Sequence, residues 1–161
     1  MEERHKMNNN DYQILKQKFN TRILIAAYSL VAILAMILYN AIATVFRIPY
    51  DIQAIRIIIP DILFNYGFNA IKNGETSIGI TLIIAFAFAL ALLILLILYA
   101  FKHRRWAFGW AVFFALADMP LLIIVKNWQA IILHVVCIAI LIFGFKMCGS
   151  IVQLDKRMWS F

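Results

Sequence analysis

The sequence predicts an all-α polytopic membrane protein that crosses the bilayer four times and forms one domain over residues 1–161. Hydrophobic residues make up 65% of the chain, charged residues only 14%, and the mean hydropathy is +0.87. A soluble domain of this length cannot bury so much apolar surface in one small core. Four apolar stretches each reach the length of about 20 residues that a spanning helix needs. The predicted spans are residues 22–46, 77–101, 106–126 and 128–149.

The basic residues set the predicted orientation. Eleven of the 15 lysines and arginines lie before or at the start of the first span, between the second and third spans, or at the end of the fourth span or after it. Because basic residues gather on the cytoplasmic side, we expect a multi-pass protein of the cell membrane with both termini in the cytoplasm. The same residues predict contact with anionic lipid on that side. They do not predict nucleic-acid binding, because no basic surface interleaved with aromatic residues exists outside the spans.

A short amphipathic segment precedes the first span, and we expect it to be helical and to continue into the membrane. Its apolar residues recur at helical spacing after an N-cap at Asn10 or Asp11. An alternative is a signal peptide cleaved near the small residues at 41–43. The apolar run is longer than the roughly 7 to 15 residues of a signal-peptide core, which favours an uncleaved anchor.

The outer part of the first span contains one amide side chain, Asn40. An amide in lipid usually forms a hydrogen bond to another helix, so we expect Asn40 to make a helix–helix contact. The alternative is a ligand role, because Asn40 is predicted at the same outer-leaflet depth as Asp118 and His134.

The connection between the first and second spans predicts a helix of its own over about residues 50–72. Its apolar residues follow helical spacing and its polar residues fall largely elsewhere, as in a helix that lies in the outer membrane interface. Pro60 is expected to break or restart this helix. A re-entrant segment is the alternative, because residues 57–68 are apolar enough to dip inward. Asp61 and Asn65 argue against it, since they interrupt the apolar run.

The second span has no hydrogen-bonding side chain from Leu82 to Leu98, so we expect it to face lipid broadly. Indole side chains favour the membrane interfaces. We therefore expect Trp106 and Trp159 to be anchors at the inner interface and Trp128 to be an anchor at the outer turn.

Residues 106–147 form a predicted hairpin whose two arms carry Asp118 and His134. Asp118 lies nine residues before Asn127 at the turn, and His134 lies seven residues after it. At 1.5 Å per helical residue, both lie roughly 10 to 14 Å below the turn. Two ionisable groups at matching depth on adjacent helices predict a pair, since an isolated charge in hydrocarbon is costly. Pro120 is expected to kink the helix beside Asp118, because it removes one backbone donor.

Three interpretations of this pair stay open. It can be structural and fix the third span to the fourth. It can handle ions or protons, together with Asn40. It can hold a metal ion, because Cys137 shares a helix face with His134 and Asp118 would complete a three-ligand set. We expect no bound cofactor, and we expect no enzyme, because the sequence has no nucleophile–base constellation and no phosphate-binding glycine loop.

The C-terminal hairpin resembles that of uncharacterised small four-span membrane proteins of Gram-positive bacteria. The matching residues are Ala117, Asp118, Asn127, Trp128, His134 and the run Ile142 to Lys146. The resemblance covers about a fifth of the chain. In those proteins the turn tends to read Gly-Asp-Trp, whereas residues 126–128 here read Lys-Asn-Trp. It implies a bacterial cytoplasmic membrane and brings no catalytic residue.

The expected function is a transport-type role that uses the Asp118–His134 pair. A bundle this small, with one fully apolar helix, cannot enclose a wide pathway alone. We therefore expect a homo-oligomeric channel or a membrane subunit of a larger transporter, with a membrane-protein partner. The alternative is a non-enzymatic interaction or regulatory protein in which the pair is structural and the cytoplasmic tails and the outer helix hold a partner.

Overall fold

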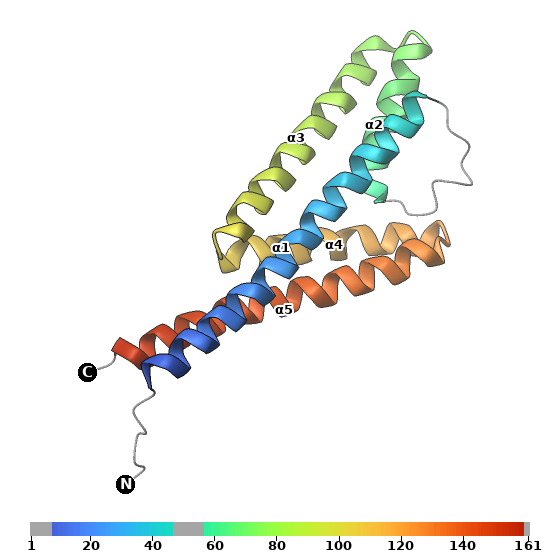
Figure 1. Cartoon of the computed structure of the whole chain (residues 1–161). Coiled ribbons are helices and arrows are strands. Elements are labelled where there is room, and N and C mark those ends of the chain that lie inside the picture. Colours follow the sequence, from blue (N-terminus) through green and yellow to red (C-terminus); the bar gives the residue numbers. More distant parts are fainter. Residues whose placement is uncertain (1–7, 47–56, 160–161) are drawn as a thin grey trace.

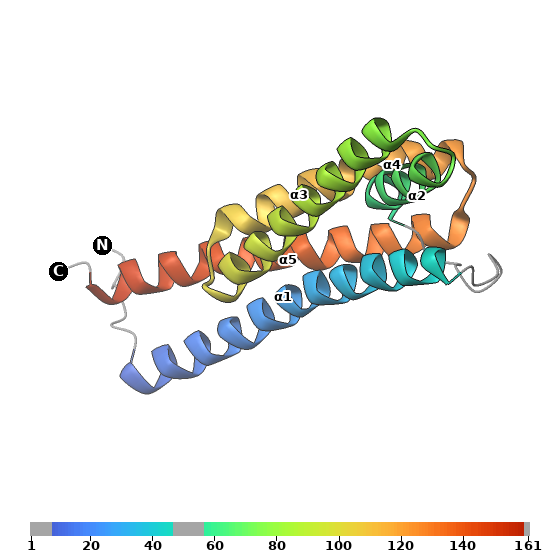
Figure 2. The same ribbon diagram turned by 90° about the horizontal axis from the view of Figure 1, so that it is seen from above.

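The computed structural model describes residues 8–46 and 57–159, and within these ranges it contains helices and no strand (Figures 1 and 2). The helices are α1 (Asn9–Val45), α2 (Ile58–Lys72), α3 (Thr76–Phe101), α4 (Arg105–Ile124) and α5 (Trp128–Trp159). All of them except α2 are long and apolar enough to cross a membrane. The prediction of an all-α chain with four membrane spans is therefore confirmed at the level of its helices.

Helix α1 is continuous over 37 residues, so the predicted amphipathic segment does continue into the first span. Its N-cap is Asn8, whose side chain accepts a hydrogen bond from the backbone N–H of Asn10 at 3.3 Å. The predicted cap at Asn10 or Asp11 is wrong, because the helix starts before the first apolar residue. At 1.5 Å per residue, α1 is about 55 Å long and exceeds the roughly 30 Å of a hydrocarbon core.

The excess length of α1 packs against an excess on α5, which runs ten residues past its predicted end at 149. The hydroxyl of Tyr12 donates to Oδ1 of Asp155 at 2.6 Å, and Nζ of Lys16 donates to the hydroxyl of Tyr12 at 2.7 Å. The start of α1 and the end of α5 therefore lie together, as the blue and red ends in Figure 1 show. The two helices are antiparallel.

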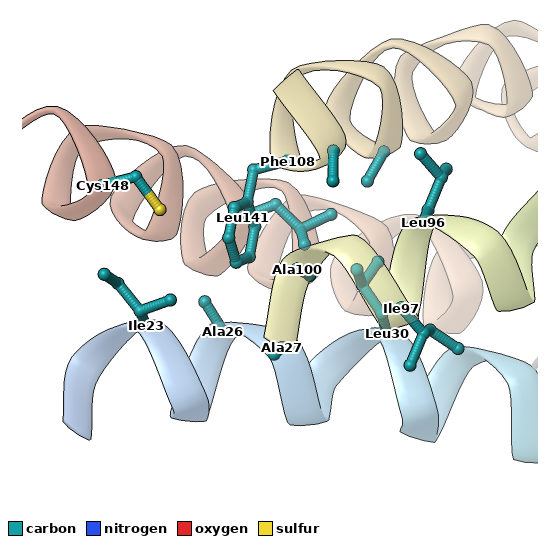
Figure 3. Close-up of a cluster of buried hydrophobic side chains, with 12 residues drawn as sticks. Ile23, Ala26, Ala27, Leu30, Leu96, Ile97, Ala100, Phe108, Leu141 and Cys148 are labelled. Carbon is teal, nitrogen blue, oxygen red and sulfur yellow. The ribbon is translucent and has the colours of Figure 1, made fainter. Parts of the chain in front are cut away.

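The core lies where α1, α3, α4 and α5 meet (Figure 3). Small side chains alternate with large ones there, and Phe108 is fully buried among them. A Cβ atom at Gly144 would lie 2.6 Å from the Cβ of Ala26 and 2.9 Å from the Phe108 ring. Since nothing larger than glycine fits, α5 approaches α1 and α4 closely, as small residues allow in membrane bundles.

Helix α2 runs parallel to α1. Two pairs of polar side chains join them: Asn40 Nδ2 lies 3.5 Å from Asp61 Oδ2, and Thr44 Oγ1 donates to Asn65 Oδ1 at 2.7 Å. Both pairs advance by four residues on each helix, so one face of α1 meets one face of α2 in the same direction. The buried carboxyl and amide thus form a polar seam between two apolar helices.

Helix α2 also runs antiparallel to α3. The ring centroids of Phe64 and Phe86 are 5.0 Å apart, and a Cβ at Gly79 would lie 2.8 Å from the Gly67 carbonyl and collide with the Ile71 side chain. Together, the neighbours on α1 and α3 place α2 lengthwise beside two candidate spans. Pro60 lies in the first turn of α2, where the helix needs no N–H donor, so a helix begins close to this residue. Residues 50–56 of the predicted helix lie outside the described residues.

Candidate functional site

Asp118 of α4 and His134 of α5 form the predicted pair. Nε2 of His134 lies 3.0 Å from Oδ2 of Asp118, and the two side chains are only 8% and 3% exposed. The turn between α4 and α5 sets their depth: Lys126 takes a positive φ of 57°, and the side chain of Asn127 accepts from the N–H of Ala130 at 3.1 Å. A tight, capped turn keeps the arms in register, which is why counting from the turn locates the pair.

The second ring nitrogen of His134 fixes how many protons the pair holds. Nδ1 lies 2.9 Å from the carbonyl oxygen of Ala130, one turn earlier in α5. A carbonyl oxygen only accepts, so Nδ1 carries a proton in this hydrogen bond. The contact between Nε2 and Asp118 then needs one further proton, on either partner. In both forms the pair is neutral overall, which lowers the cost of burying it.

Asp118 also reaches a third helix. Its Oδ1 accepts a hydrogen bond from the backbone N–H of Ile59 at 2.8 Å. Ile59 lies in the first turn of α2, and the N-cap residue Ile57 makes no side-chain cap of its own. The carboxyl of Asp118 therefore serves as a cap supplied from α4, at the positive end of the α2 dipole. This contact could not be predicted from the sequence, since no pattern links a backbone N–H to a side chain 59 residues away.

The pair lies on the wall of a cavity of about 210 Å³ between the helices. The lining is almost entirely aliphatic and aromatic and includes Leu30, Leu93 and Phe114. Asp118 and His134 are its ionisable members, and Cys137 adds a thiol. An apolar cavity with so few polar partners tends to stay dry, so the pair lies in a medium of low polarity.

Asn40 does not join Asp118 and His134. It is 3% exposed and pairs with Asp61 of α2, which is itself 7% exposed. The expected helix–helix contact of Asn40 is therefore present. Its partner, Asp61, belongs to the segment that was predicted to lie in the membrane interface. A signal was available: Asn40 and Thr44 are four residues apart, as are Asp61 and Asn65, and two such faces match each other.

The proposed metal ligands do not form a site. No group of three histidine, cysteine or acidic side chains close enough to bind a metal ion occurs within residues 8–46 and 57–159. Cys137 lines the cavity without completing a set with Asp118 and His134. Trp106 and Trp128 are 43% and 69% exposed, while the side chain of Trp159 lies outside the described part.

Comparison with known proteins adds no relative. No protein family matches the chain, and no match is found among curated proteins or solved structures. The geometry around Asp118 is therefore the basis for the function.

Proposed function

We propose that the protein has a transport-type role in a bacterial cytoplasmic membrane, with both termini in the cytoplasm. One observation carries the proposal: Oδ1 of Asp118 accepts from the N–H of Ile59 in the first turn of α2 at 2.8 Å, while Oδ2 of the same carboxyl lies 3.0 Å from Nε2 of His134. The carboxyl of Asp118 thus holds the start of a short helix and also takes part in a proton-dependent pair. A change in the protonation of the pair can therefore change the position of α2.

The chemistry of the pair makes it sensitive to protons. If the shared proton leaves, Nε2 of His134 and Oδ2 of Asp118 become two acceptors 3.0 Å apart and repel each other. If a second proton arrives, the apolar cavity holds an uncompensated positive charge. Either change weakens the contact, and the hydrogen bond from Asp118 to Ile59 is the next link in the same network.

The direction of α2 supports the re-entrant alternative over an interfacial helix. A helix in the interface plane would cross the ends of the spans, whereas α2 packs lengthwise along α1 and α3. Because Asp61 is level with Asn40, the start of α2 at Ile58 is level with Ile37, roughly 12 Å inside the end of α1. Half-helices whose N-termini face a charged group within the membrane are a recurring part of transporters.

The small cavity supports assembly with other chains. Its volume of about 210 Å³ and its apolar lining offer no continuous polar path through the bundle. We therefore place the function in a homo-oligomeric channel or in a larger transporter of which this chain is a membrane subunit.

The test is ion flux in liposomes that contain the purified protein and a pH-sensitive dye. Asp118→Asn keeps an oxygen that accepts from Ile59 but removes the proton-sharing carboxyl, so flux should be lost while the fold is kept. Asp155→Asn is the matched control, because it makes the same carboxyl-to-amide change beyond the predicted end of the fourth span. Unchanged flux in Asp118→Asn would remove the ion-handling role.

A second candidate is a non-enzymatic interaction or regulatory protein. It is favoured by the closed network: across the described ranges, no buried side-chain nitrogen or oxygen lacks a hydrogen-bond partner. In that case the pair serves only to fix α2, α4 and α5. Deleting residues 1–18 should then lose a partner that co-purifies with the full chain, whereas retention of the partner would count against this candidate.

A further inference from the structure

A shallow groove lies between α1 and α5 on the outside of the bundle, away from Asp118. It has a volume of about 300 Å³ and is lined by Arg22, Ile25, Ala139, Ile140 and Phe143. The lining is apolar except for one guanidinium. The groove thus combines an apolar channel along the helices with a positive charge at one end.

Arg22 is held at this end by an aromatic ring. Its guanidinium carbon lies 5.6 Å from the centroid of the Phe143 ring, within the range of a cation–π contact. The ring limits the freedom of a long side chain at the predicted inner edge of the first span. A guanidinium placed in this way presents the planar set of donors that binds a phosphate with two hydrogen bonds.

Two lysines lie on the helix faces that line the groove, further toward the predicted cytoplasmic side. Lys18 lies seven residues before Ile25 on α1, and Lys146 lies seven residues after Ala139 on α5, so each shares a helix face with a lining residue. Both lysines are exposed. The close approach of α1 and α5 at Gly144 puts Lys146 at about the level of Arg22.

The charge at this level is not offset by acidic residues nearby in the sequence. No aspartate or glutamate occurs between Asp11 and Asp51, or between Asp118 and Asp155. Asp155 itself lies two to three helical turns away and accepts hydrogen bonds from Tyr12 and Lys16. The mouth of the groove is therefore positive, while its walls are apolar.

We propose that this groove binds one anionic phospholipid of the cytoplasmic leaflet. The phosphate lies against Arg22, Lys18 and Lys146, and an acyl chain follows the apolar walls formed by Ile25 and Ile140. From Lys146 to Ile140 the groove descends six residues, or roughly 9 Å, into the predicted hydrocarbon. A lipid has this combination of a charged head and an apolar chain, and the depth of Ala139 keeps a water-soluble peptide out.

Native mass spectrometry of the full chain tests the site. Phosphatidylglycerol, which is anionic, and phosphatidylcholine, which is zwitterionic, are added separately to the detergent-solubilised protein, and bound lipids are counted. We expect one phosphatidylglycerol to bind with at least tenfold higher affinity than phosphatidylcholine. Equal binding of both lipids would overturn the proposal, because the cluster of cations would then not select charge.

The variant Arg22→Gln with Lys146→Gln should weaken phosphatidylglycerol binding about tenfold. The matched control is Lys72→Gln with Lys126→Gln, which removes the same charge at the other end of the bundle. Lys72 is a good match because its Nζ also lies over an aromatic ring, 4.2 Å from the centroid of Phe68. An equal loss in both double variants would overturn the site, since binding would then depend on net charge alone.

A third variant keeps every charge and fills the groove. Ile140→Trp places a larger side chain on the apolar wall and should displace the acyl chain, so phosphatidylglycerol binding should fall while the circular dichroism spectrum stays helical. Unchanged binding would overturn the proposal. Because none of these residues contacts Asp118, lipid binding and ion flux can fail independently of each other.

Discussion

The backbone N–H of Ile59 donates to Oδ1 of Asp118 across 2.8 Å, so a side chain of α4 caps a helix that begins about 60 residues earlier in the chain. The other oxygen of the same carboxyl contacts His134 of α5. One side chain therefore connects the α2–α3 hairpin to the α4–α5 hairpin. At this depth the carboxyl of Asp118 thus joins three helices, α2, α4 and α5.

Replacing Asp118 should lower the free energy of unfolding by an amount that depends on the new side chain. Asp118→Asn keeps an acceptor for Ile59 and should cost about 1–3 kcal/mol, whereas Asp118→Ala should cost about 3–5 kcal/mol because Nε2 of His134 and the N–H of Ile59 both lose the carboxyl that they contact. Thermal unfolding of the purified protein in detergent measures both. Equal losses for the two variants would mean that the cap contributes nothing beyond the pair.

The contact between α2 and α3 should be sensitive to one methyl group. Gly79→Ala puts a Cβ 2.8 Å from the Gly67 carbonyl and against Ile71, so we expect a loss of about 1–3 kcal/mol in the free energy of unfolding. Gly109→Ala is the matched control, because its nearest neighbour, the Phe145 ring, is 3.5 Å away. The control should be neutral or stabilised by up to about 1 kcal/mol, since alanine favours a helix. Similar effects at both glycines would contradict the close packing.

The lengthwise packing of α2 predicts a gradient of accessibility. In a chain with Cys137 and Cys148 replaced by serine, a cysteine at Ile62 should be protected from a membrane-impermeant maleimide, and a cysteine at Lys72 should react quickly. Both positions are exposed in the isolated chain, so a difference in rate reports the membrane and not the fold. Equal reaction rates at the two positions would instead indicate that α2 lies in the membrane interface.

The joined ends of α1 and α5 should separate in acid. The hydrogen bond from Tyr12 holds the pKa of the Asp155 carboxyl below its ordinary value, beyond the predicted end of the fourth span. A lowered pKa in the folded state means that the contact stabilises the fold above the unfolded pKa of about 3.9 and is lost as the pH falls through the folded value.

Spin labels at Gln13 and Gln153, both exposed, measure this separation as a distance. In Tyr12→Phe the pKa of Asp155 should rise toward its ordinary value, so the labels should separate at a higher pH. A distance that does not change between about pH 7 and about pH 2, a range that spans the ordinary carboxyl pKa, would show that apolar packing alone holds the ends together.

The spans and the pair could be predicted because both depend on short-range rules. A run of about 20 apolar residues has one stable place in a bilayer, and the structure starts α3 and α4 within one residue of the predicted positions at 77 and 106. Counting from one tight turn is enough to locate Asp118 and His134. In each case the residues that permit the prediction lie close in the sequence to the span or side chain that they predict.

The direction of α2 could not be predicted, because it depends on contacts between residues that are far apart in the sequence. Its apolar spacing suits both a helix in the interface and a helix packed among spans, and the connection from Val45 to Ile58 is too long to fix an orientation. The decision comes from contacts with α1 and α3, such as Asn40 with Asp61, which depend on the assembled bundle. From the sequence alone, Asp61 is expected to face solvent, because its buried partner lies in another helix.

The packing of α1 against α5 also has a consequence for biosynthesis. The ribosome makes Ala26 more than a hundred residues before Gly144, and these residues meet where only glycine fits. Helix α1 must therefore wait, with its small-residue face turned to lipid or to a chaperone, until α5 is inserted. A nascent chain that stops before α5 has no native partner for that face, so quality control in the membrane has a long interval in which to recognise it.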